Sequence, residues 1–258
     1  MSTASTVSPV SVKLPCGFFI DKKLVKDAQI TPMTGAVRKM IASPKVRQNP
    51  ASIVDTLLSS CVVSIGGQSR LRNADFMRMF LADRDFLMIE IRKISLGDTV
   101  TATLQCDSCK EKLDVKINLD RDVPVKSLEG EDFQIDAESE IVTFKIKREG
   151  IDARFRLPIG EDQHYVAPLF RKNPIDANYA LYERCLLEWN GTPAGECEPR
   201  LFENLLLPTL NILDEEFARV LPGPDMRVPA DCPYCQNEIT VGMESSDFLF
   251  QLPKREKT

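Results

Sequence analysis

The sequence predicts an α+β fold with a helical N-terminal region, two separated β-hairpins and a mixed β-hairpin and helical insertion between those hairpins. Three observations support this prediction. Apolar residues recur at helical spacing between Asn49 and Ser95, and they alternate with polar residues around Cys106 and again around Cys232. Spacing of three or four residues is typical of a helix with a buried face, whereas strict alternation is typical of a half-buried strand.

Composition sets the outer bounds of the interpretation. The 258 residues are 43% hydrophobic and 28% charged, which is enough to bury a sizeable core in one or two domains. The net charge of −5 argues against a protein whose main task is to hold phosphate backbones. No run reaches the roughly 18 apolar residues of a membrane-spanning helix. Eight unevenly spaced cysteines, without a secretory signal pattern, favour a reducing compartment.

The first part of the chain is expected to form a flexible arm and then a helical domain. Residues 1–13 are rich in Ser, Thr and Val without periodicity, which is typical of an arm, and the helical domain is expected over 14–98. A short strand is predicted from Val25 to Ile30, followed by a short helix that Pro44 ends. Asn49 and Pro50 suit the N-cap and first position of a second helix.

The longest helical region is predicted from Asn73 to Ser95, with a break near Leu81. Its second half has apolar residues on more than one stripe, which is typical of a helix that is central in the core or pressed against a partner. Acidic residues at its start, basic residues at its end and Gly97 beyond it suit the helix dipole and a glycine C-cap. Arg84, which stands between two aspartates, is interpreted as a local surface ion pair.

Two matching cysteine pairs stand at the predicted hairpin tips. Cys106 and Cys109 enclose two residues, and so do Cys232 and Cys235. A two-residue turn lets both thiolates of a pair face one ion, and two such turns complete the tetrahedron of a structural zinc site. The four cysteines are therefore the expected ligands of one structural Zn²⁺. The predicted α+β fold therefore combines a helical N-terminal region with a discontinuous four-cysteine zinc ribbon, which is made of two β-hairpins.

Other interpretations of the cysteines stay open. They could form disulfides or remain free thiols, or one pair could be a redox dithiol. Redox pairs usually open a helix beside a βαβ unit, and neither pair does so here. Many zinc-binding turns have Gly after the second cysteine, where φ is positive, whereas this chain has Lys110 and Gln236.

The two ribbon halves are expected at 99–120 and 225–250, followed by a tail at 251–258. The insertion between them, 121–224, must leave and return at the same place. Alternation within it predicts a strand near Phe133 and a β-hairpin. Further on, Gly160-Glu161-Asp162 is interpreted as a turn. Helices are predicted from Pro174 to Gly191, from Pro199 to Leu207 and from Leu213 to Leu221.

The predicted β-hairpin of the insertion carries basic residues on its outer face. They are Lys145, Lys147, Arg148, Arg154 and Arg156. Nucleic-acid binding by this face is disfavoured, because no stacking aromatic residues are interleaved with the basic ones and an acidic stretch is adjacent. A solvated or protein-binding face is expected instead.

The sequence offers little for catalysis, and the protein is expected not to be an enzyme. His164 is the single histidine, and no motif identifies a nucleophile or a phosphate-binding glycine loop. His164 is therefore interpreted as a surface or core residue, with the role of a catalytic base as the alternative. Cys61 and Cys185 lie on apolar helix faces and are interpreted as core residues. Cys197 stands on a loop with no identifiable partner.

Four stretches follow one another in an order that resembles a known family. They are Leu14-Pro15-Cys16-Gly17 with Pro32-Met33-Thr34-Gly35, Leu57-Leu58-Ser59-Ser60-Cys61-Val62, Asp83-Arg84-Asp85-Phe86-Leu87 running to Leu96-Gly97-Asp98, and Cys232-Pro233-Tyr234-Cys235 with Phe248-Leu249. In this order they resemble the baseplate hub proteins of contractile-tailed phages, including the T-even-type baseplate hub assembly chaperones. No single motif carries the resemblance, which depends on their order and spacing together.

The resemblance implies a non-enzymatic role in building the tail baseplate, as an assembly factor for the hub or as a subunit retained in the particle. The implied partners are other phage baseplate hub, spike or tube proteins, without membrane, small-molecule substrate or nucleic acid. The implied location is the bacterial host cytoplasm during assembly, or the virion tail baseplate. The alternative from the cysteines alone is a zinc-ribbon accessory protein that binds nucleic acid, with steeply salt-dependent binding.

Overall fold

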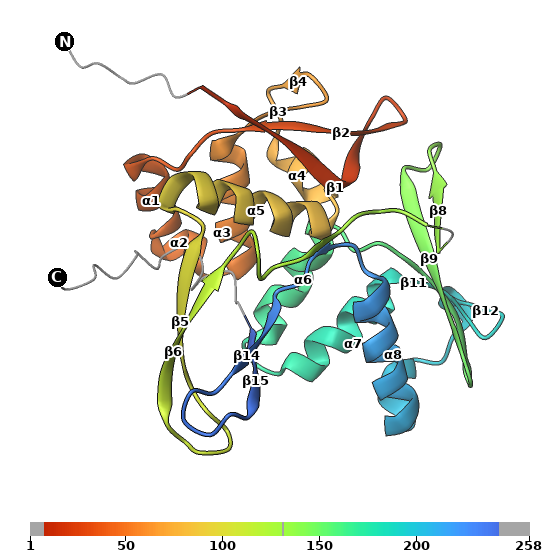
Figure 1. Cartoon of the computed structure of the whole chain (residues 1–258). Coiled ribbons are helices and arrows are strands. Elements are labelled where there is room, and N and C mark those ends of the chain that lie inside the picture. The colour runs from red at the N-terminus through yellow and green to blue at the C-terminus, as the bar shows by residue number, and fades with distance from the viewer. Residues whose placement is uncertain (1–7, 131, 243–258) are drawn as a thin grey trace, which may run out of the picture.

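The computed structural model describes residues 8–130 and 132–242. Within these residues the chain forms helices and several small antiparallel sheets without a barrel, which confirms the predicted α+β class. Figure 1 shows an N-terminal sheet with its helices, a second sheet with its own helices, and two long hairpins that lie side by side.

The N-terminal sheet has four antiparallel strands in the order β1-β2-β3-β4. Their bounds are β1 Val10–Ile20, β2 Lys23–Ile30, β3 Val62–Ile65 and β4 Gln68–Ser69. The register of β1 and β2 shifts between Lys13 and Phe18. At this irregularity the Asp83 carboxylate accepts hydrogen bonds from the backbone N–H groups of Cys16, at 2.8 Å, and Gly17, at 3.0 Å. Asp83 therefore provides hydrogen-bond acceptors for two backbone N–H groups of β1 at the point where its pairing with β2 is irregular.

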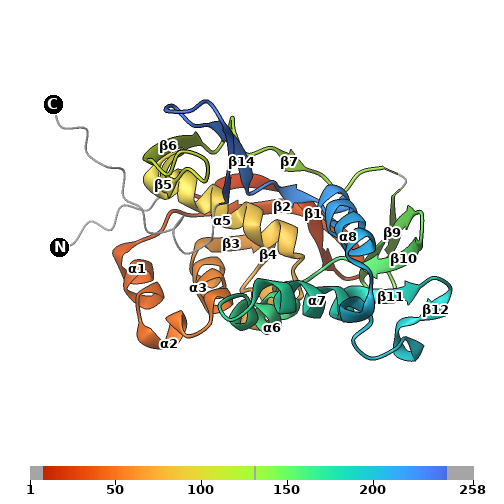
Figure 2. The ribbon, with the colours of Figure 1, turned by 90° about the horizontal axis from the view of Figure 1, so that it is seen from below.

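Five helices accompany this sheet. They are α1 Gly35–Ile41, α2 Pro44–Arg47, α3 Pro50–Cys61, α4 Asn73–Arg78 and α5 Leu81–Leu96. Asn49 caps α3 as predicted, because its side chain accepts a hydrogen bond from the N–H of Ala51 at 3.0 Å. Figure 2 shows α5 between the sheet and the insertion. Its buried Leu87, Met88 and Ile91 belong to the same core as α3 and the sheet, which confirms its predicted central position.

The expectation of a flexible arm followed by a helical domain is wrong in two respects. Of the predicted arm, residues 1–7 lie outside the described residues, and residues 10–13 belong to β1, where Val10 pairs with Ile30. Residues within 14–98 also supply most of β1 and the whole of β2, β3 and β4, of which only a strand from Val25 to Ile30 was predicted. The physical reason is the alternation of Val10, Val12 and Leu14, which places apolar side chains on one face of a strand.

The insertion contains a second sheet and three helices. The sheet order is β12-β11-β10-β9-β8. The strands are β8 Phe133–Asp136, β9 Ile141–Arg148, β10 Ile151–Arg156, β11 Leu186–Trp189 and β12 Thr192–Pro193. The helices are α6 Gly160–Phe170, α7 Pro174–Cys185 and α8 Leu207–Val220, with 3-10 turns at Ala194–Glu196 and Leu201–Asn204.

An aromatic cluster joins the second sheet to its helices. The Phe155 ring lies 5.7 Å from the Phe144 ring and 5.3 Å from the Phe217 ring, between ring centroids. Tyr182 of α7 lies 4.8 Å from Phe217 of α8. These edge-to-face and stacked contacts are the geometry that aromatic pairs favour. Apolar residues that alternate along β9 and β10, Phe144 and Phe155 among them, form the buried face of the predicted hairpin.

Several predictions within the insertion are wrong. The helix predicted from Pro199 to Leu207 is only a 3-10 turn at Leu201–Asn204, and the next helix, α8, begins at Leu207 rather than at Leu213. The Gly160-Glu161-Asp162 segment begins helix α6 instead of forming a turn, and Asp162 accepts a hydrogen bond from the N–H of Ile159 at 3.0 Å. A Cβ atom at Gly160 would lie 2.6 Å from the carbonyl oxygen of Phe76, so the glycine permits close packing against α4. The helix predicted up to Gly191 ends at Cys185, because the next residues pair with β10 as β11.

The insertion leaves and returns at one place, as predicted. β7 Val125–Lys126 pairs with β13 Gly223–Pro224. The N–H of Asp225 also donates to the carbonyl oxygen of Pro124 at 2.9 Å. Gly223 has a φ of 104°, and a Cβ atom there would lie 2.9 Å from Ala82. The base of the insertion therefore packs directly on the first turn of α5.

Candidate metal centre

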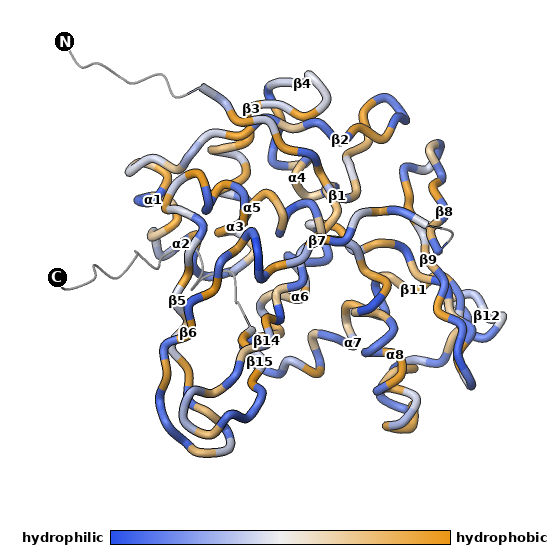
Figure 3. The backbone as a smooth tube through the Cα atoms, viewed as in Figure 1, coloured by the Kyte–Doolittle hydropathy of each residue, from blue (hydrophilic) through white to orange (hydrophobic). Residues whose placement is uncertain are grey.

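Two β-hairpins carry the paired cysteines. The first consists of β5 Thr99–Gln105 and β6 Lys112–Asn118, and the second of β14 Arg227–Asp231 and β15 Glu238–Gly242. Hydrophobic and hydrophilic residues alternate along the first hairpin, as Figure 3 shows by colour. This alternation is the period that predicted the strands. Both hairpins were therefore predicted correctly. The second ribbon half was expected up to residue 250, and its residues after 242, with Phe248-Leu249 and the tail at 251–258, lie outside the described residues.

The structure brings all four cysteine sulfurs together. They lie within 4.8 Å of one another. The sulfurs of Cys106 and Cys235 are 3.7 Å apart, and those of Cys109 and Cys232 are also 3.7 Å apart. Each of these close contacts joins one hairpin to the other. The cluster is therefore a junction between two segments that are far apart in the sequence.

The spacing of the sulfurs fits a metal ion better than a disulfide. A bonded pair of sulfurs is about 2.05 Å apart, and all four cysteines are free thiols in this structure. Four sulfurs placed about 2.3 Å from one ion at tetrahedral angles lie about 3.8 Å from one another. The two observed separations of 3.7 Å agree with that geometry. The residues present can therefore hold a metal ion.

The two cysteine turns have the same backbone structure. The N–H of Cys106 donates to the carbonyl oxygen of Glu111 at 2.9 Å, and the N–H of Lys110 donates to the carbonyl oxygen of Cys106 at 2.9 Å. In the second turn the N–H of Cys232 donates to the carbonyl oxygen of Asn237, and the N–H of Gln236 donates to the carbonyl oxygen of Cys232, both at 2.9 Å. Two equivalent turns therefore face one another across the sulfur cluster.

The residue after each second cysteine adopts a left-handed conformation. Lys110 has a φ of 63° and Gln236 has a φ of 61°. This is the conformation that Gly adopts without strain at such a position, and a residue with a Cβ atom adopts it at a cost. The absence of Gly from these turns therefore does not change their geometry.

Backbone groups of the first turn favour a thiolate. The backbone N–H groups of Cys109 and Ser108 lower the pKa of Cys106 to about 7. The backbone N–H of Glu111 lowers the pKa of Cys109, but burial and the adjacent thiols outweigh it and raise this pKa to about 12. Because the thiolate is the metal-binding form, the first turn already stabilises one ligand in that form.

The sulfur cluster rests on a small apolar core that connects the hairpins to α5. Next to the sulfurs, Leu113 is buried and Leu104 and Ile239 pack against it. At the base of the hairpins, Ile89 of α5 is buried together with apolar side chains from all four hairpin strands and from the turn after β6. These side chains are Val100, Ile117, Leu119, Val123, Val228 and Val241. The hairpins are therefore anchored at both ends, by the sulfur cluster at the tips and by α5 at the base.

A buried charged cluster that the sequence did not predict joins α3, α4, α5 and α6. The Arg84 side chain is 0% exposed and pairs with the Asp55 carboxylate of α3 at 2.6 Å. It also donates to the Gln163 side chain at 2.9 Å and to the carbonyl oxygen of Phe76 at 2.8 Å. The interpretation of Arg84 as a local surface ion pair is wrong, because its acidic partner lies on another helix.

His164 belongs to the same buried charged cluster. Its imidazole Nε2 forms an ion pair or hydrogen bond with Asp55, and its carbonyl oxygen accepts a hydrogen bond from Asn49 at 3.1 Å. Burial opposes ionisation of Asp55, but the hydrogen bond from His164 and the Arg84 guanidinium outweigh it and lower the pKa of this carboxyl. The histidine therefore connects α6 to α3, which agrees with its interpretation as a structural residue.

The basic residues of the β9–β10 hairpin are paired with carboxylates. Lys145 lies 2.7 Å from Asp152, and Arg148 lies 2.8 Å from Glu216. The other pairs are Lys147 with Asp152, Arg154 with Glu188, and Arg156 with Asp162. Asp162 is 0% exposed, so Arg156 points towards the protein rather than outward. The expected basic outer face is therefore interrupted by acidic partners.

The remaining cysteines lie apart from the sulfur cluster. Cys61 and Cys185 are buried, as expected for core residues, and burial raises the pKa of each thiol. The Cys197 sulfur contacts the carbonyl oxygens of Thr192 and Pro193 at 3.7 and 3.5 Å.

Among the helices of the described residues, none combines the length and the apolar composition that a membrane-spanning segment needs.

Comparison with known proteins identifies a family. A family model described as T4 bacteriophage base plate protein matches residues 22–250, which is most of the chain. The matched range includes both cysteine hairpins and the whole insertion. No curated protein and no solved structure matches the chain.

Proposed function

The chain belongs to the T4 bacteriophage base plate protein family, and from this premise we propose that it helps to build the central hub of the baseplate. It acts either as an assembly factor for the hub or as a subunit retained in it. The family match over residues 22–250 carries the proposal. The four stretches that resemble hub proteins and hub assembly chaperones support the finer assignment to the hub. Its partners are then other baseplate hub, spike or tube proteins.

The four clustered cysteines hold one structural zinc ion in this proposal. Cys106, Cys109, Cys232 and Cys235 offer four sulfur ligands at separations that suit a tetrahedron. When bound, zinc supplies a cross-link between the hairpins, and four thiolates leave no open position for a substrate. The sulfur ligands and the enclosed site favour zinc over the harder ions that prefer oxygen ligands.

The cross-link has a defined mechanical role within the fold. The β7–β13 pairing closes the base of the insertion, and β6 and β14 are the strands on either side of it along the chain. Joining the tips of the two hairpins therefore fixes the path by which the chain enters and leaves the insertion. The insertion then presents its own sheet and helices to other baseplate proteins in a fixed position.

The alternative classes receive less support from the described residues. The ion pairs of Arg148, Arg154 and Arg156 oppose a function of the β9–β10 hairpin in holding phosphate backbones. His164 is hydrogen-bonded to Asp55, as in a catalytic triad, but no serine, threonine or cysteine side chain is bonded to it in the described structure. A structural role in the baseplate is therefore the better proposal.

Co-purification from infected cells tests this proposal. A tagged copy of the chain is expected to co-purify with hub, spike or tube proteins when it is expressed during infection of the bacterial host. The same purification from uninfected cells is the control. Failure to associate with any tail protein in infected cells would contradict the proposal.

A mass-spectrometric inventory of purified particles separates the two forms of the proposal. A retained subunit is present in the tail baseplate in a fixed copy number. An assembly factor is absent from the finished particle but is found with hub proteins in the host cytoplasm during assembly. Either result identifies where the protein acts.

A further inference from the structure

Asp85 of α5 lies where two apolar hollows meet. One hollow has a volume of about 240 Å³ and lies between the start of α5, the end of α8 and the segment around β13. The other has a volume of about 650 Å³ and lies among α3, α5, α6 and α7. Leu81 and Asp85 line both hollows. Because they are one helical turn apart, they form one short stripe along α5.

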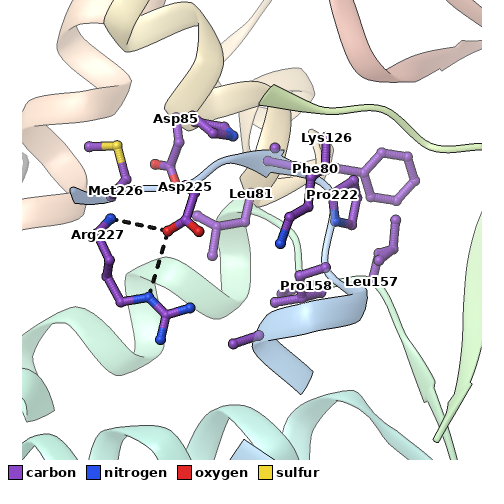
Figure 4. A pocket seen from close by; sticks show the side chains of 15 residues that line it. Phe80, Leu81, Asp85, Lys126, Leu157, Pro158, Pro222, Asp225, Met226 and Arg227 are labelled. Atoms are coloured by element: carbon purple, nitrogen blue, oxygen red, sulfur yellow. Dashed lines mark hydrogen bonds and ion pairs between the residues drawn. The ribbon is translucent and has the colours of Figure 1, made fainter. Parts of the chain in front are cut away.

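The linings of both hollows are largely apolar. Figure 4 shows Asp85 with Leu81 and Met226 in the smaller hollow, where Phe80, Leu157 and Pro222 also lie. Val166, Ala167 and Leu181 line the larger hollow, and the Phe170 side chain, 44% exposed, stands at its edge. Apolar side chains of a partner would displace water from such hollows.

The neighbouring charges of α5 are already used within the fold. Asp83 accepts the backbone N–H groups of Cys16 and Gly17. The donors of Arg84 are taken by Asp55, Gln163 and the Phe76 carbonyl group. Asp85, in contrast, has no hydrogen bond or ion pair to any residue between 8 and 242 that the structure describes. Among those residues, Arg84 is the charge that lowers its pKa.

The basic residues that line the two hollows do not neutralise Asp85. The Arg227 side chain pairs with Asp225 at 3.6 Å, as the dashed line from its guanidinium in Figure 4 marks. Arg171 donates to the carbonyl oxygens of Gln48 and Arg47 at 3.5 and 3.3 Å. Lys126 also lines the smaller hollow, but no ion pair joins it to Asp85 within the described residues. Within residues 8–130 and 132–242 the carboxylate therefore has an acceptor capacity that no donor uses.

An unused carboxylate among apolar side chains lowers the stability of the isolated protein. Burial raises the pKa of Asp85 to about 7, against the opposing effect of the Arg84 guanidinium. An apolar residue of similar size would fill this position at lower cost. Residues that break a packing rule in this way commonly serve binding.

We propose that Asp85 receives a lysine or arginine side chain from another baseplate protein, while apolar residues on either side of that cation fill the two hollows. The inference rests on the proposed function, which supplies the class of partner. Charge complementarity selects the occupant, because a cation that is hydrogen-bonded to a shielded carboxylate gains more than one in water. The partner segment is therefore apolar with one basic residue near its centre.

Site-specific photo-crosslinking in infected cells tests this inference with the full chain. Benzoylphenylalanine replaces Phe170 at the edge of the larger hollow, and in a control protein it replaces Ile135, which is 54% exposed on β8. The Phe170 position is expected to crosslink to a baseplate protein, at a segment that has a lysine or arginine among apolar residues. The Ile135 position is expected not to crosslink to that segment.

Charge exchange then tests the role of Asp85 itself. Asp85→Lys is expected to reduce the crosslink at least tenfold, and replacement of the partner's basic residue by Glu is expected to restore it. Asp85→Asn is expected to weaken binding of the identified partner at least tenfold while the melting temperature of the isolated protein stays the same or rises. Asp27→Asn, the same change at an exposed position of β2, is the matched control and leaves both unchanged.

Several outcomes overturn the inference. They are a crosslink to residues 243–258 of the same chain or to a second copy, a crosslink that Asp85→Lys leaves unchanged, and a lower melting temperature for Asp85→Asn with unchanged binding. If the tagged chain co-purifies with baseplate proteins but Phe170 crosslinks to none of them, the inference fails and the proposed function stands. If no tail protein co-purifies at all, both fail.

Discussion

Single residues determine how the helices of this protein meet. Arg84 of α5 contacts side chains or backbone of α3, α4 and α6, although it is completely buried. A buried guanidinium is tolerated only when its donors are bonded and its charge is paired. Asp55, Gln163 and Phe76 together supply those partners. Because they come from separate parts of the chain, no local sequence pattern around Arg84 predicts them.

Removal of the buried cation is expected to destabilise the protein strongly. Arg84→Met leaves Asp55 without its paired charge, and breaking a buried pair in this way costs about 3–5 kcal/mol. Denaturant unfolding measures the change in the free energy of unfolding. Arg154→Met removes a partly exposed partner of Glu188 and serves as the control, with an expected cost below about 1 kcal/mol. Equal effects of the two substitutions would contradict the assigned role of Arg84.

The Asp55 carboxyl makes the stability depend on pH in the acid range. Its pKa is lower in the folded state than in the unfolded chain, where it is about 3.9. Its contribution is therefore fully present above about pH 4 and is lost as the pH falls through the lower folded pKa. Asp55→Asn is expected to be less stable at neutral pH and to lose less stability on acidification. Melting temperatures measured from pH 7 downward check this, and an unchanged slope below pH 4 would count against it.

At the scale of elements, the cysteine turns depend on two residues in the left-handed conformation. Lys110 is exposed, so a substitution there acts through the backbone rather than through side-chain packing. A β-branched residue is especially unfavourable at positive φ. Lys110→Val is therefore expected to lower the stability by about 1–2 kcal/mol.

The matched control for this turn is Lys112→Val, at an exposed position of β6. Valine suits a strand, so this change is expected to be neutral or slightly stabilising. Thermal unfolding of the two variants compares the positions. Lys110→Val would contradict the assigned geometry if it were as stable as Lys112→Val.

The elements that the sequence predicted are those with a local signal. Asn49 and Pro50 marked the start of α3, and alternation marked β9 and β10. Helix α6 was missed because its cap does not come from a Ser, Thr or Asn at the N-cap. Asp162 supplies it from inside the helix, where the sequence resembles a turn. Trp189 was assigned to a helix because its spacing from Cys185 also fits a helical face, and only the pairing with β10 decides the matter.

The candidate site was predictable for the same reason. The two-residue spacing within each cysteine pair is a local signal, and the structure brings Cys106, Cys109, Cys232 and Cys235 together. Asp85 gave no such signal, since it stood beside Asp83 and Arg84 as one of three apparently similar charges. Only the three-dimensional structure separates the two residues that are used inside the fold from the one that faces the hollows.

At the scale of the whole molecule, the ribbon formed by β5, β6, β14 and β15 has a small apolar group of its own at its tip, and its base packs on Ile89 of α5. The side chains around the sulfur cluster form a group separate from the two larger cores of the N-terminal region and the insertion. Structural zinc is commonly coupled to the folding of the segment that binds it. The metal is therefore expected to hold the ribbon, while the larger cores depend on apolar packing.

Removal of the metal is expected to release the ribbon before the rest of the fold. After treatment with a chelator, backbone amides of β5, β6, β14 and β15 are expected to exchange hydrogen quickly, while those of α3 and β9 stay protected. Hydrogen exchange followed by mass spectrometry measures this. Readdition of zinc is the control and is expected to restore protection. Uniform loss of protection across the chain would contradict a separate role for the ribbon.

The central claim is that two distant cysteine turns hold one zinc ion and thereby fix the insertion that contacts other baseplate proteins. Metal analysis of protein purified without added zinc tests this claim most directly. About one zinc per chain is expected, and Cys106→Ser or Cys235→Ser is expected to lose the metal and unfold the ribbon, whereas Cys197→Ser keeps it. Metal-free wild-type protein with the same melting temperature in the presence and absence of zinc would contradict the claim.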